Sequence, residues 1–121
     1  MIEHKHLIIR AEVENPPLAS DIENMNQWMH DLIEKIGMEL LLGPYTVFCD
    51  DPANEGLTSI CAITTSSITL HSWINPAILQ LDVYSCKEFD IQIVFDHIRQ
   101  RFKTTKIEYK FIDRETDLTL L

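Results

Sequence analysis

Three side chains that could do chemistry fall in two short segments of this sequence. A hydroxyl, an imidazole and a thiol occur at Ser66, His71 and Cys86. These residues fall in the segments 64–73 and 79–86, in which apolar and polar residues alternate as in half-buried strands. Two neighbouring strands would bring a nucleophile, an acid/base group and a proton donor to one place. We therefore expect the rest of the chain to be the scaffold that holds these three groups together.

The bulk composition describes a globular chain with one hydrophobic core. Its 121 residues are enough for a single domain spanning 1–121, and 45% of them are hydrophobic. The net charge of −9 argues against a nucleic-acid partner, because such proteins need Lys and Arg to neutralise phosphates. No apolar run reaches membrane-spanning length, and no apolar leader precedes the first strand pattern. We expect a cytoplasmic protein that does not bind membranes.

The cysteine pattern argues against structural cross-links. Cys49, Cys61 and Cys86 make an odd number, and no C-x-x-C spacing occurs. A disulfide framework or a zinc site is therefore not expected, and a reducing compartment is the default. We predict that the chain uses no metal.

Hydrophobic periodicity predicts eight elements in the order β-α-β-β-β-β-α-β. Ser20 and Glu23 have the spacing of a capping box at the start of the first helix, and Gly37 suits its end. Gly43 and Pro44 indicate a bulge in the second strand, and the tail after Arg114 is expected to be loose. Short central connections favour antiparallel strands, so the fold class is α+β: a two-layer sandwich with both helices on one face of an antiparallel sheet. The predicted strands are 6–13, 39–49, 57–63, 67–73, 78–86 and 105–113, and the predicted helices are 20–36 and 89–102.

Residues 65–73 (TSSITLHSW) and the apolar strand that ends at Cys86 resemble the S-adenosylmethionine decarboxylase family in its short prokaryotic form. In that family the self-cleaving serine lies in a pattern like Glu-Ser-His-Leu-Thr-Ile-His-Thr-Trp-Pro-Glu, which aligns here without gaps. Residues 55–58 (EGLT) lie where the family has His-Gly-Val-Ser. The resemblance is tightest over residues 56–86, and the element order extends it over nearly the whole chain.

The resemblance implies a specific chemistry for each position. Ser66 would attack the carbonyl of Thr65, so that the chain splits between these two residues and Ser66 becomes a pyruvoyl group. That cofactor forms a Schiff base with a substrate amine and takes up the electrons left by carbon dioxide. The resemblance gives His71 an acid/base role in self-cleavage, Thr58 a helping hydroxyl, and Cys86 the role of proton donor to the decarboxylated substrate. It further implies a homodimer of cleaved protomers, a small-molecule amine substrate and a place in spermidine and polyamine biosynthesis.

Several positions depart from the family pattern. Thr65 replaces the Glu before the cleaved serine, and Ser67 replaces a His. The family's Trp-Pro-Glu reads Trp-Ile-Asn here, so Asn75 stands where a Glu is expected to bind the ribose hydroxyls. Pro52 occupies the place of an aromatic residue that stacks on adenine, a task that Phe48 could take if the loop is shifted. These changes leave the residues for cleavage present and alter those for nucleoside binding.

Two other functions fit the same residues. One is a pyruvoyl-dependent decarboxylase of a smaller amino acid such as ornithine or arginine, which the altered nucleoside-binding positions favour. The other is a non-catalytic homologue that never cleaves itself and acts as a binding or regulatory protein, which Thr65 favours. Decarboxylation of S-adenosylmethionine, the function that the resemblance itself implies, would use all of Ser66, His71 and Cys86.

Overall fold

The structure, a computed structural model, describes residues 2–64 and 66–121. The predicted site residue Thr65 lies outside the described residues. Within them the chain forms the predicted order of six strands and two α-helices, with a short 3₁₀ turn before the first helix. The elements are β1 (Lys5–Val13), α1 (Ile22–Lys35), β2 (Leu40–Cys49), β3 (Gly56–Ile63), β4 (Ser66–Trp73), β5 (Ile78–Ser85), α2 (Ile91–Phe102) and β6 (Thr104–Asp113).

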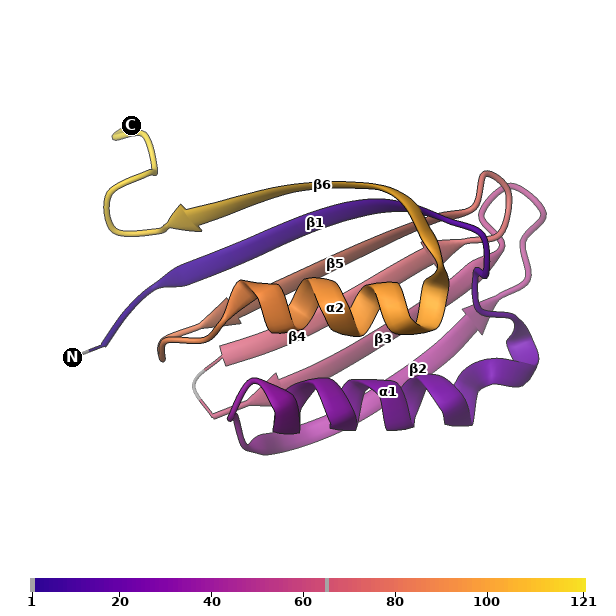
Figure 1. Cartoon of the computed structure of the whole chain (residues 1–121), viewed down its shortest axis with the longest axis horizontal. Coiled ribbons are helices and arrows are strands. Elements are labelled where there is room, and N and C mark those ends of the chain that lie inside the picture. Colours follow the sequence, from indigo (N-terminus) through magenta and orange to yellow (C-terminus); the bar gives the residue numbers. More distant parts are fainter. Residues whose placement is uncertain (1, 65) are drawn as a thin grey trace.

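The six strands form one sheet in the order β2-β3-β4-β5-β1-β6, and every neighbouring pair is antiparallel. Both helices cover the same side of this sheet, as Figure 1 shows. We call the covered side the helix face and the other side the open face. The α+β two-layer sandwich expected from the sequence is therefore confirmed.

The core lies between the sheet and the helices because strand side chains alternate between the two faces. On β4, Ile68 and Leu70 are fully buried on the helix face, whereas Ser67 and His71 are exposed on the open face. The helices contribute matching apolar stripes, among them Met25, Met29, Leu32, Val94 and Ile98. Burial of this kind contributes about 25 cal/mol per Å² of apolar surface, so the covered face fixes which strand residues point outwards.

The start of the first helix differs from the prediction. A 3₁₀ turn at Ala19–Asp21 precedes α1, which begins at Ile22, and no capping bond from Ser20 to Glu23 forms. The carboxylate of Asp21 instead accepts a hydrogen bond from the backbone N–H of Leu18 at 2.7 Å. The predicted capping box is therefore wrong, because the Asp next to Ser20 supplies the acceptor at this end of the helix.

Arg114, the residue before the tail, is held against the chain beside β1 and against β5. The backbone N–H of Arg114 donates to the carbonyl of His4 at 2.8 Å, and its guanidinium lies 3.7 Å from the centre of the Tyr84 ring. The N–H of Asp117 donates to the carbonyl of Asp113 at 2.8 Å and closes a turn. The predicted bulge in β2 is confirmed, since its register against β3 shifts between Leu42 and Tyr45.

Neither a membrane-spanning helix nor a metal-binding cluster occurs within residues 2–64 and 66–121. No helix in this part of the chain is long and apolar enough to cross a membrane. Among the same residues, no group of three or more His, Cys, Asp or Glu side chains is placed to hold a metal ion.

Candidate functional site

Ser66 and Cys86 meet where β4 begins and β5 has just ended. The hydroxyl oxygen of Ser66 accepts a hydrogen bond from the backbone N–H of Cys86 at 3.0 Å. The antiparallel register of β4 and β5, in which Ser67 pairs with Tyr84, brings these two chain segments side by side. Two of the three residues singled out from the sequence are therefore neighbours in the fold, through the side chain of Ser66 and the backbone of Cys86.

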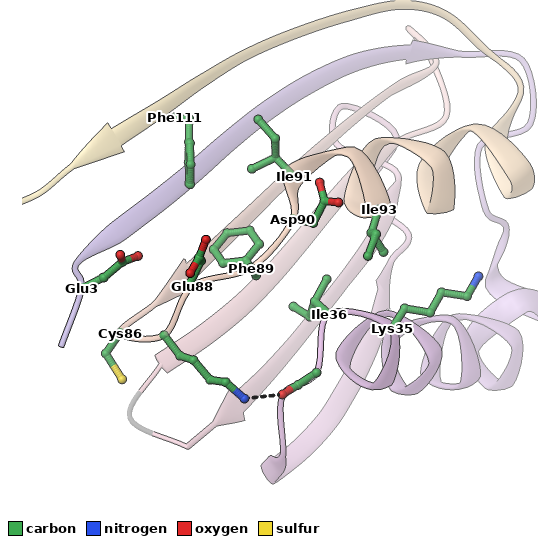
Figure 2. A pocket seen from close by; sticks show the side chains of 12 residues that line it. Glu3, Lys35, Ile36, Cys86, Glu88, Phe89, Asp90, Ile91, Ile93 and Phe111 are labelled. Atoms are coloured by element: carbon green, nitrogen blue, oxygen red, sulfur yellow. Dashed lines mark hydrogen bonds between the residues drawn. The ribbon is translucent and has the colours of Figure 1, made fainter. Parts of the chain in front are cut away.

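Cys86 lines two hollows on either side of its turn. The larger, of about 1070 Å³, opens between the ends of the two helices and the strand ends of β1 and β6. Figure 2 shows Cys86 at one end of this hollow and Lys35 at the other, with Phe89 in the middle and Phe111 on the side of β6. The smaller, of about 270 Å³, has Thr64 in its wall as well as Cys86. A small molecule therefore has room beside Cys86.

His71 lies with Thr58 on the open face. The two residues are directly opposite each other in the β3–β4 ladder, and the hydroxyl of Thr58 lies 3.0 Å from Nδ1 of His71. A hydroxyl in contact with an imidazole is the arrangement of an acid/base pair, since the ring can hold the proton that the hydroxyl shares. The two residues to which the resemblance gives separate roles in self-cleavage are therefore in contact with each other.

The structure separates these two pairs. Ser66 has the strand parity of Ile68 and Leu70 on the helix face, whereas His71 is on the open face. Five residues of extended strand also span about 16 Å along the sheet. The expectation that Ser66, His71 and Cys86 converge within one chain is therefore wrong. A strand reverses its facing at every residue, so an interval of five places the two side chains on opposite faces.

Two small hollows flank His71 on the open face. One, of about 190 Å³, is lined by Thr58, Trp73 and Cys49 among others. The other, of about 160 Å³, is lined by Thr69 and Asp82 among others. His71 belongs to both walls and so stands between two places where parts of a ligand could lie.

The two residues predicted to bind substrate lie elsewhere. Asn75 is exposed in the turn between β4 and β5, beyond the Trp73 end of the open face. Phe48 packs against the core, and its strand neighbour on the same face, Thr46, bonds to Asn26 of α1 at 2.6 Å. Phe48 therefore points to the helix face, and the structure gives it no place beside His71.

The other cysteines differ sharply from each other in exposure. Burial raises the pKa of the Cys61 thiol to about 11, so this thiol stays protonated and unreactive. Cys49 is exposed at the end of β2. Cys61 is therefore a core residue, as a free buried cysteine usually is.

Sequence reasoning missed a polar cluster on the open face near the Ser66 end of the sheet. His6 lies 3.3 Å from a carboxylate oxygen of Asp82 through Nε2 and 3.1 Å from the guanidinium of Arg114 through Nδ1. Tyr84 pairs with both His6 and Ser67 in the ladders on either side of β5. The signal in the sequence was limited to the open-face positions of His6 and Tyr84 in their strands, because the contact of His6 with Arg114 joins residues far apart in the chain.

Comparison with known proteins identifies the family. The family model described as S-adenosylmethionine decarboxylase matches residues 5–115, nearly the whole chain. The chain belongs to the S-adenosylmethionine decarboxylase family. This confirms the resemblance that the spacing of Ser66, His71 and Cys86 indicated.

Individual members of the S-adenosylmethionine decarboxylase family are distant from this chain. It is 36% identical over 62 residues to an S-adenosylmethionine decarboxylase proenzyme of Pyrobaculum islandicum, an alignment that covers 50% of each protein. The chain thus spans about half the length of the Pyrobaculum relatives it matches. A proenzyme of the same description from Archaeoglobus fulgidus is 22% identical over 115 residues, which cover 94% of this chain and 99% of that relative.

A solved family structure shares the fold. The crystal structure of the adenosylmethionine decarboxylase from Aquifex aeolicus superimposes with a TM-score of 0.68 over 93% of this chain and 90% of that chain. The sequence identity is 14%. At that identity the match establishes the sheet and its two helices as the S-adenosylmethionine decarboxylase fold.

Proposed function

We propose that this chain is a self-cleaving, pyruvoyl-dependent decarboxylase of S-adenosylmethionine. The observation that carries the proposal is the 3.0 Å hydrogen bond between Ser66 and the backbone of Cys86. It joins the residue that would become the cofactor to the residue that would donate the proton. Membership of the family supports the same activity, and so do the relatives described as S-adenosylmethionine decarboxylase proenzymes.

The hydrogen bond from the Cys86 N–H to the Ser66 hydroxyl has a role in the proposed cleavage step. When Ser66 Oγ attacks the carbonyl of Thr65, it loses its proton, and a hydrogen-bond donor already aimed at the oxygen stabilises the charge that develops there. The peptide bond becomes an ester, and elimination then releases residues 1–65 with that oxygen in their new carboxylate. The Cys86 N–H is left facing residue 66, which becomes the terminal pyruvoyl group after hydrolysis and loss of ammonia.

The residues around Ser66 fit a pyruvoyl group. This group supplies a carbonyl that binds the substrate amine and accepts the electrons left by carbon dioxide. The Cys86 thiol lies on the neighbouring segment and can hold the proton that the substrate carbon receives. The hollows on either side of Cys86 leave space for the rest of the substrate.

We further propose that the working unit is a homodimer in which each site uses two chains. Within one chain His71 and Thr58 do not reach Ser66, although the proposed cleavage needs an acid/base group there. A second chain stacked on the open face about a two-fold axis beside Thr69, close to the midpoint between Ser66 and His71, would bring His71 of the partner subunit over the start of β4. This removes the separation along the strand, and residue 66, the first of β4, must turn from the helix face to meet that imidazole.

Exposed apolar side chains on the open face support this stacking. Tyr45, Val47, Ile60 and Ile8 lie there with exposed fractions of 61%, 63%, 50% and 43%. Tyr45, Val47 and Ile60 lie together on β2 and β3, and an exposed apolar surface of this kind favours contact with another protein surface. The second chain would cover it and complete the site in one step.

Intact mass tests the proposal directly. Self-cleavage converts the 121-residue chain into fragments of 65 and 56 residues, and the second fragment carries a terminus without a free amine. Ser66→Ala removes the nucleophile and is expected to stay whole. A wild-type chain that keeps its full mass through prolonged incubation would contradict the proposal and favour the non-catalytic homologue.

Release of carbon dioxide from carboxyl-labelled substrates identifies the substrate. We expect turnover of S-adenosylmethionine and none of ornithine or arginine. The reverse result would assign the chain to the decarboxylases of smaller amino acids.

A further inference from the structure

A serine interrupts the apolar face of β5 next to Cys86. Leu79, Leu81 and Val83 point into the core, and Ser85 at the following position is just as buried, with an exposed fraction of 0%. A buried hydroxyl is unfavourable unless it is hydrogen-bonded, and an apolar side chain would continue the pattern. The hydroxyl at this position therefore has a task that packing alone does not explain.

The Ser85 hydroxyl closes the turn that carries Cys86. It accepts a hydrogen bond from the backbone N–H of Lys87 at 3.0 Å and donates one to the carbonyl of the same residue at 2.8 Å. Both bonds span Cys86, so the hydroxyl fixes the backbone on either side of the thiol. Its oxygen also lies 3.7 Å from the sulfur of Met38, which anchors the turn against the segment after α1.

Three further bonds hold the same turn. The Cys86 N–H is bound by Ser66 Oγ at 3.0 Å, and the Cys86 carbonyl accepts from the N–H of Glu3 at 2.9 Å. The ammonium of Lys87 donates to the carbonyl of Gly37 at 2.9 Å, the bond drawn in Figure 2. In the proposed reaction the first of these does not survive, because Ser66 Oγ leaves with residues 1–65. After cleavage the Ser85 hydroxyl carries more of the constraint on Cys86 than before.

We propose that Ser85 is a positioning residue that aims the Cys86 thiol during turnover. The inference rests on the proposed decarboxylase activity for its catalytic part and on the hydrogen bonds of the turn for its geometric part. It predicts different effects of Ser85 on self-cleavage and on decarboxylation. Loss of the Ser85 hydroxyl leaves self-cleavage in place, because Ser66 and its bond to Cys86 remain, and disturbs the later delivery of the proton.

The destination of the proton gives a readout that a purely structural serine would not move. When the proton is placed on the substrate carbon, water then hydrolyses the Schiff base, which releases the decarboxylated amine and restores the pyruvoyl carbonyl. A proton placed on the carbon of residue 66 instead leaves that residue as an N-terminal alanine with the substrate's nitrogen, and water releases the rest of the substrate as an aldehyde. This second outcome is counted by N-terminal sequencing of the 56-residue fragment.

The experiment compares Ser85→Ala with the matched control Ser59→Ala in the cleaved protein with S-adenosylmethionine. Ser59 is equally buried and bonds through its hydroxyl to Thr46 at 2.8 Å, away from Cys86. We expect Ser85→Ala to lower kcat about 10- to 100-fold, as small misplacements of a reacting group do, and to raise the alanine-terminated fraction several-fold. Ser59→Ala should leave kcat and the alanine-terminated fraction at wild-type values. Ser85→Thr, which keeps a hydroxyl, should also show wild-type values of kcat and of the alanine-terminated fraction.

A second readout needs no turnover. Peptide-resolved alkylation by iodoacetamide compares Cys86 with the exposed Cys49 in the same molecule. Ser85→Ala is expected to change the rate at Cys86 at least threefold and leave Cys49 unchanged. If the wild type neither cleaves nor decarboxylates, the proposed function fails, and this ratio still decides the positioning role.

A folded Ser85→Ala protein with wild-type alanine fraction and wild-type Cys86 alkylation overturns the inference. If Ser85→Ala does not fold, Lys87→Met takes its place, since Lys87 is exposed and its side chain ties the same turn to Gly37. It should shift both readouts in the same direction by a smaller factor. Wild-type values in Lys87→Met would then count against the inference.

Discussion

At the scale of single residues, His97 joins the two helices through a reciprocal pair of bonds. Its Nε2 lies 2.9 Å from the carbonyl of Trp28, and the indole N–H of Trp28 donates to the His97 carbonyl at 3.3 Å. The two rings stack with centroids 4.4 Å apart. Lys35 lies 3.2 Å from the other ring nitrogen, which accepts from the ammonium when Nε2 carries the hydrogen. His97 is therefore held neutral between its two partners.

This environment predicts a pH-dependent stability. Burial lowers the pKa of His97 below its ordinary 6.5 and the Lys35 ammonium lowers it further, while the Trp28 carbonyl and Asp31 oppose the shift. As pH falls through about 6.5, the unfolded chain takes up a proton that the folded chain excludes. The free energy of unfolding then drops by at most about 1.4 kcal/mol per pH unit until the lowered pKa is reached.

The measurement is the urea midpoint of wild type and His97→Phe between pH 5 and 8. The Phe variant keeps a ring against Trp28 but lacks the imidazole hydrogen bonds, so its free energy of unfolding should be about 1 kcal/mol lower at pH 7.5. Below pH 6.5 its urea midpoint should depend less on pH than that of the wild type. His30→Gln, at an exposed position of α1, serves as the control and should follow the wild type. Parallel curves for wild type and His97→Phe would refute the assignment.

The residue types of the site could be predicted from the sequence, but the side of the sheet on which each residue lies could be predicted only in part. Strand patterns around Ser66, His71 and Cys86 identified chemistry-bearing side chains on adjacent strands. The interval of five between Ser66 and His71 already implies opposite faces, because the period of a strand is two. The contact of Ser66 with the backbone of Cys86 could not be predicted, since it depends on where β5 ends and its turn begins.

At the scale of elements, the β3–β4 pair is built around a close approach at Gly56. A side-chain carbon at this residue would overlap the backbone carbonyl of Ser72 on β4. One residue along, the Leu57 N–H donates to the Ser72 hydroxyl at 3.0 Å, and the next ladder position holds Thr58 opposite His71. The geometry of the Thr58–His71 pair therefore depends on this approach.

Gly56→Ala is expected to force β3 and β4 apart and to destabilise the protein by about 1–3 kcal/mol, as overpacking does. It should also slow self-cleavage, because the pair that supplies the acid/base group is displaced. Gly37→Ala is the control, since the added carbon meets nothing within 4 Å and only the positive φ of 73° costs stability, about 1 kcal/mol. Thermal unfolding and the time course of intact mass measure the two effects. Equal cleavage rates in the two variants would show that the approach does not position His71.

The elements themselves followed from periodicity, apart from their ends. The apolar stripe of α1 and the alternation in β4 and β5 were strong enough to fix type and order. The start of α1 was misplaced because Asp21, rather than Ser20, engages the preceding backbone. The contacts of Arg114 with Tyr84 and His4 were missed because these residues lie far away in the sequence. Contacts of that kind leave no local signal.

At the scale of the whole molecule, the sheet has one covered face and one face that presents both apolar and functional side chains. Ladder registers arrange the open face in rows: Tyr45, Ile60, Thr69 and Asp82 form one, and Val47, Thr58, His71 and Gln80 form the next. The apolar members lie towards β2 and the polar ones towards β5. A second chain stacked here would bury the apolar part and face the polar part with its own.

Mixed dimers decide whether the proposed site is shared between two chains. Ser66→Ala alone lacks the nucleophile, and His71→Ala alone lacks the imidazole, so neither homodimer should cleave itself at the wild-type rate. In a mixed dimer the His71→Ala chain keeps Ser66 and receives an imidazole from the other chain. We therefore expect cleavage of the His71→Ala chain alone, at up to the wild-type rate, recorded by the intact mass of two differently tagged chains.

An interface variant tests whether such a rescue depends on the contact between the two open faces. Ile60→Glu, placed in both chains, puts a charge on the open face at a half-exposed position opposite Thr69, beside the proposed two-fold axis. Burying an unpaired carboxylate between two sheets is unfavourable, so the dimer should dissociate and the rescue should be lost with it. Light scattering gives the oligomeric state of the same samples. If the His71→Ala chain stays intact in a mixed dimer, then His71 acts within its own chain, and β4 must rearrange to bring it to Ser66.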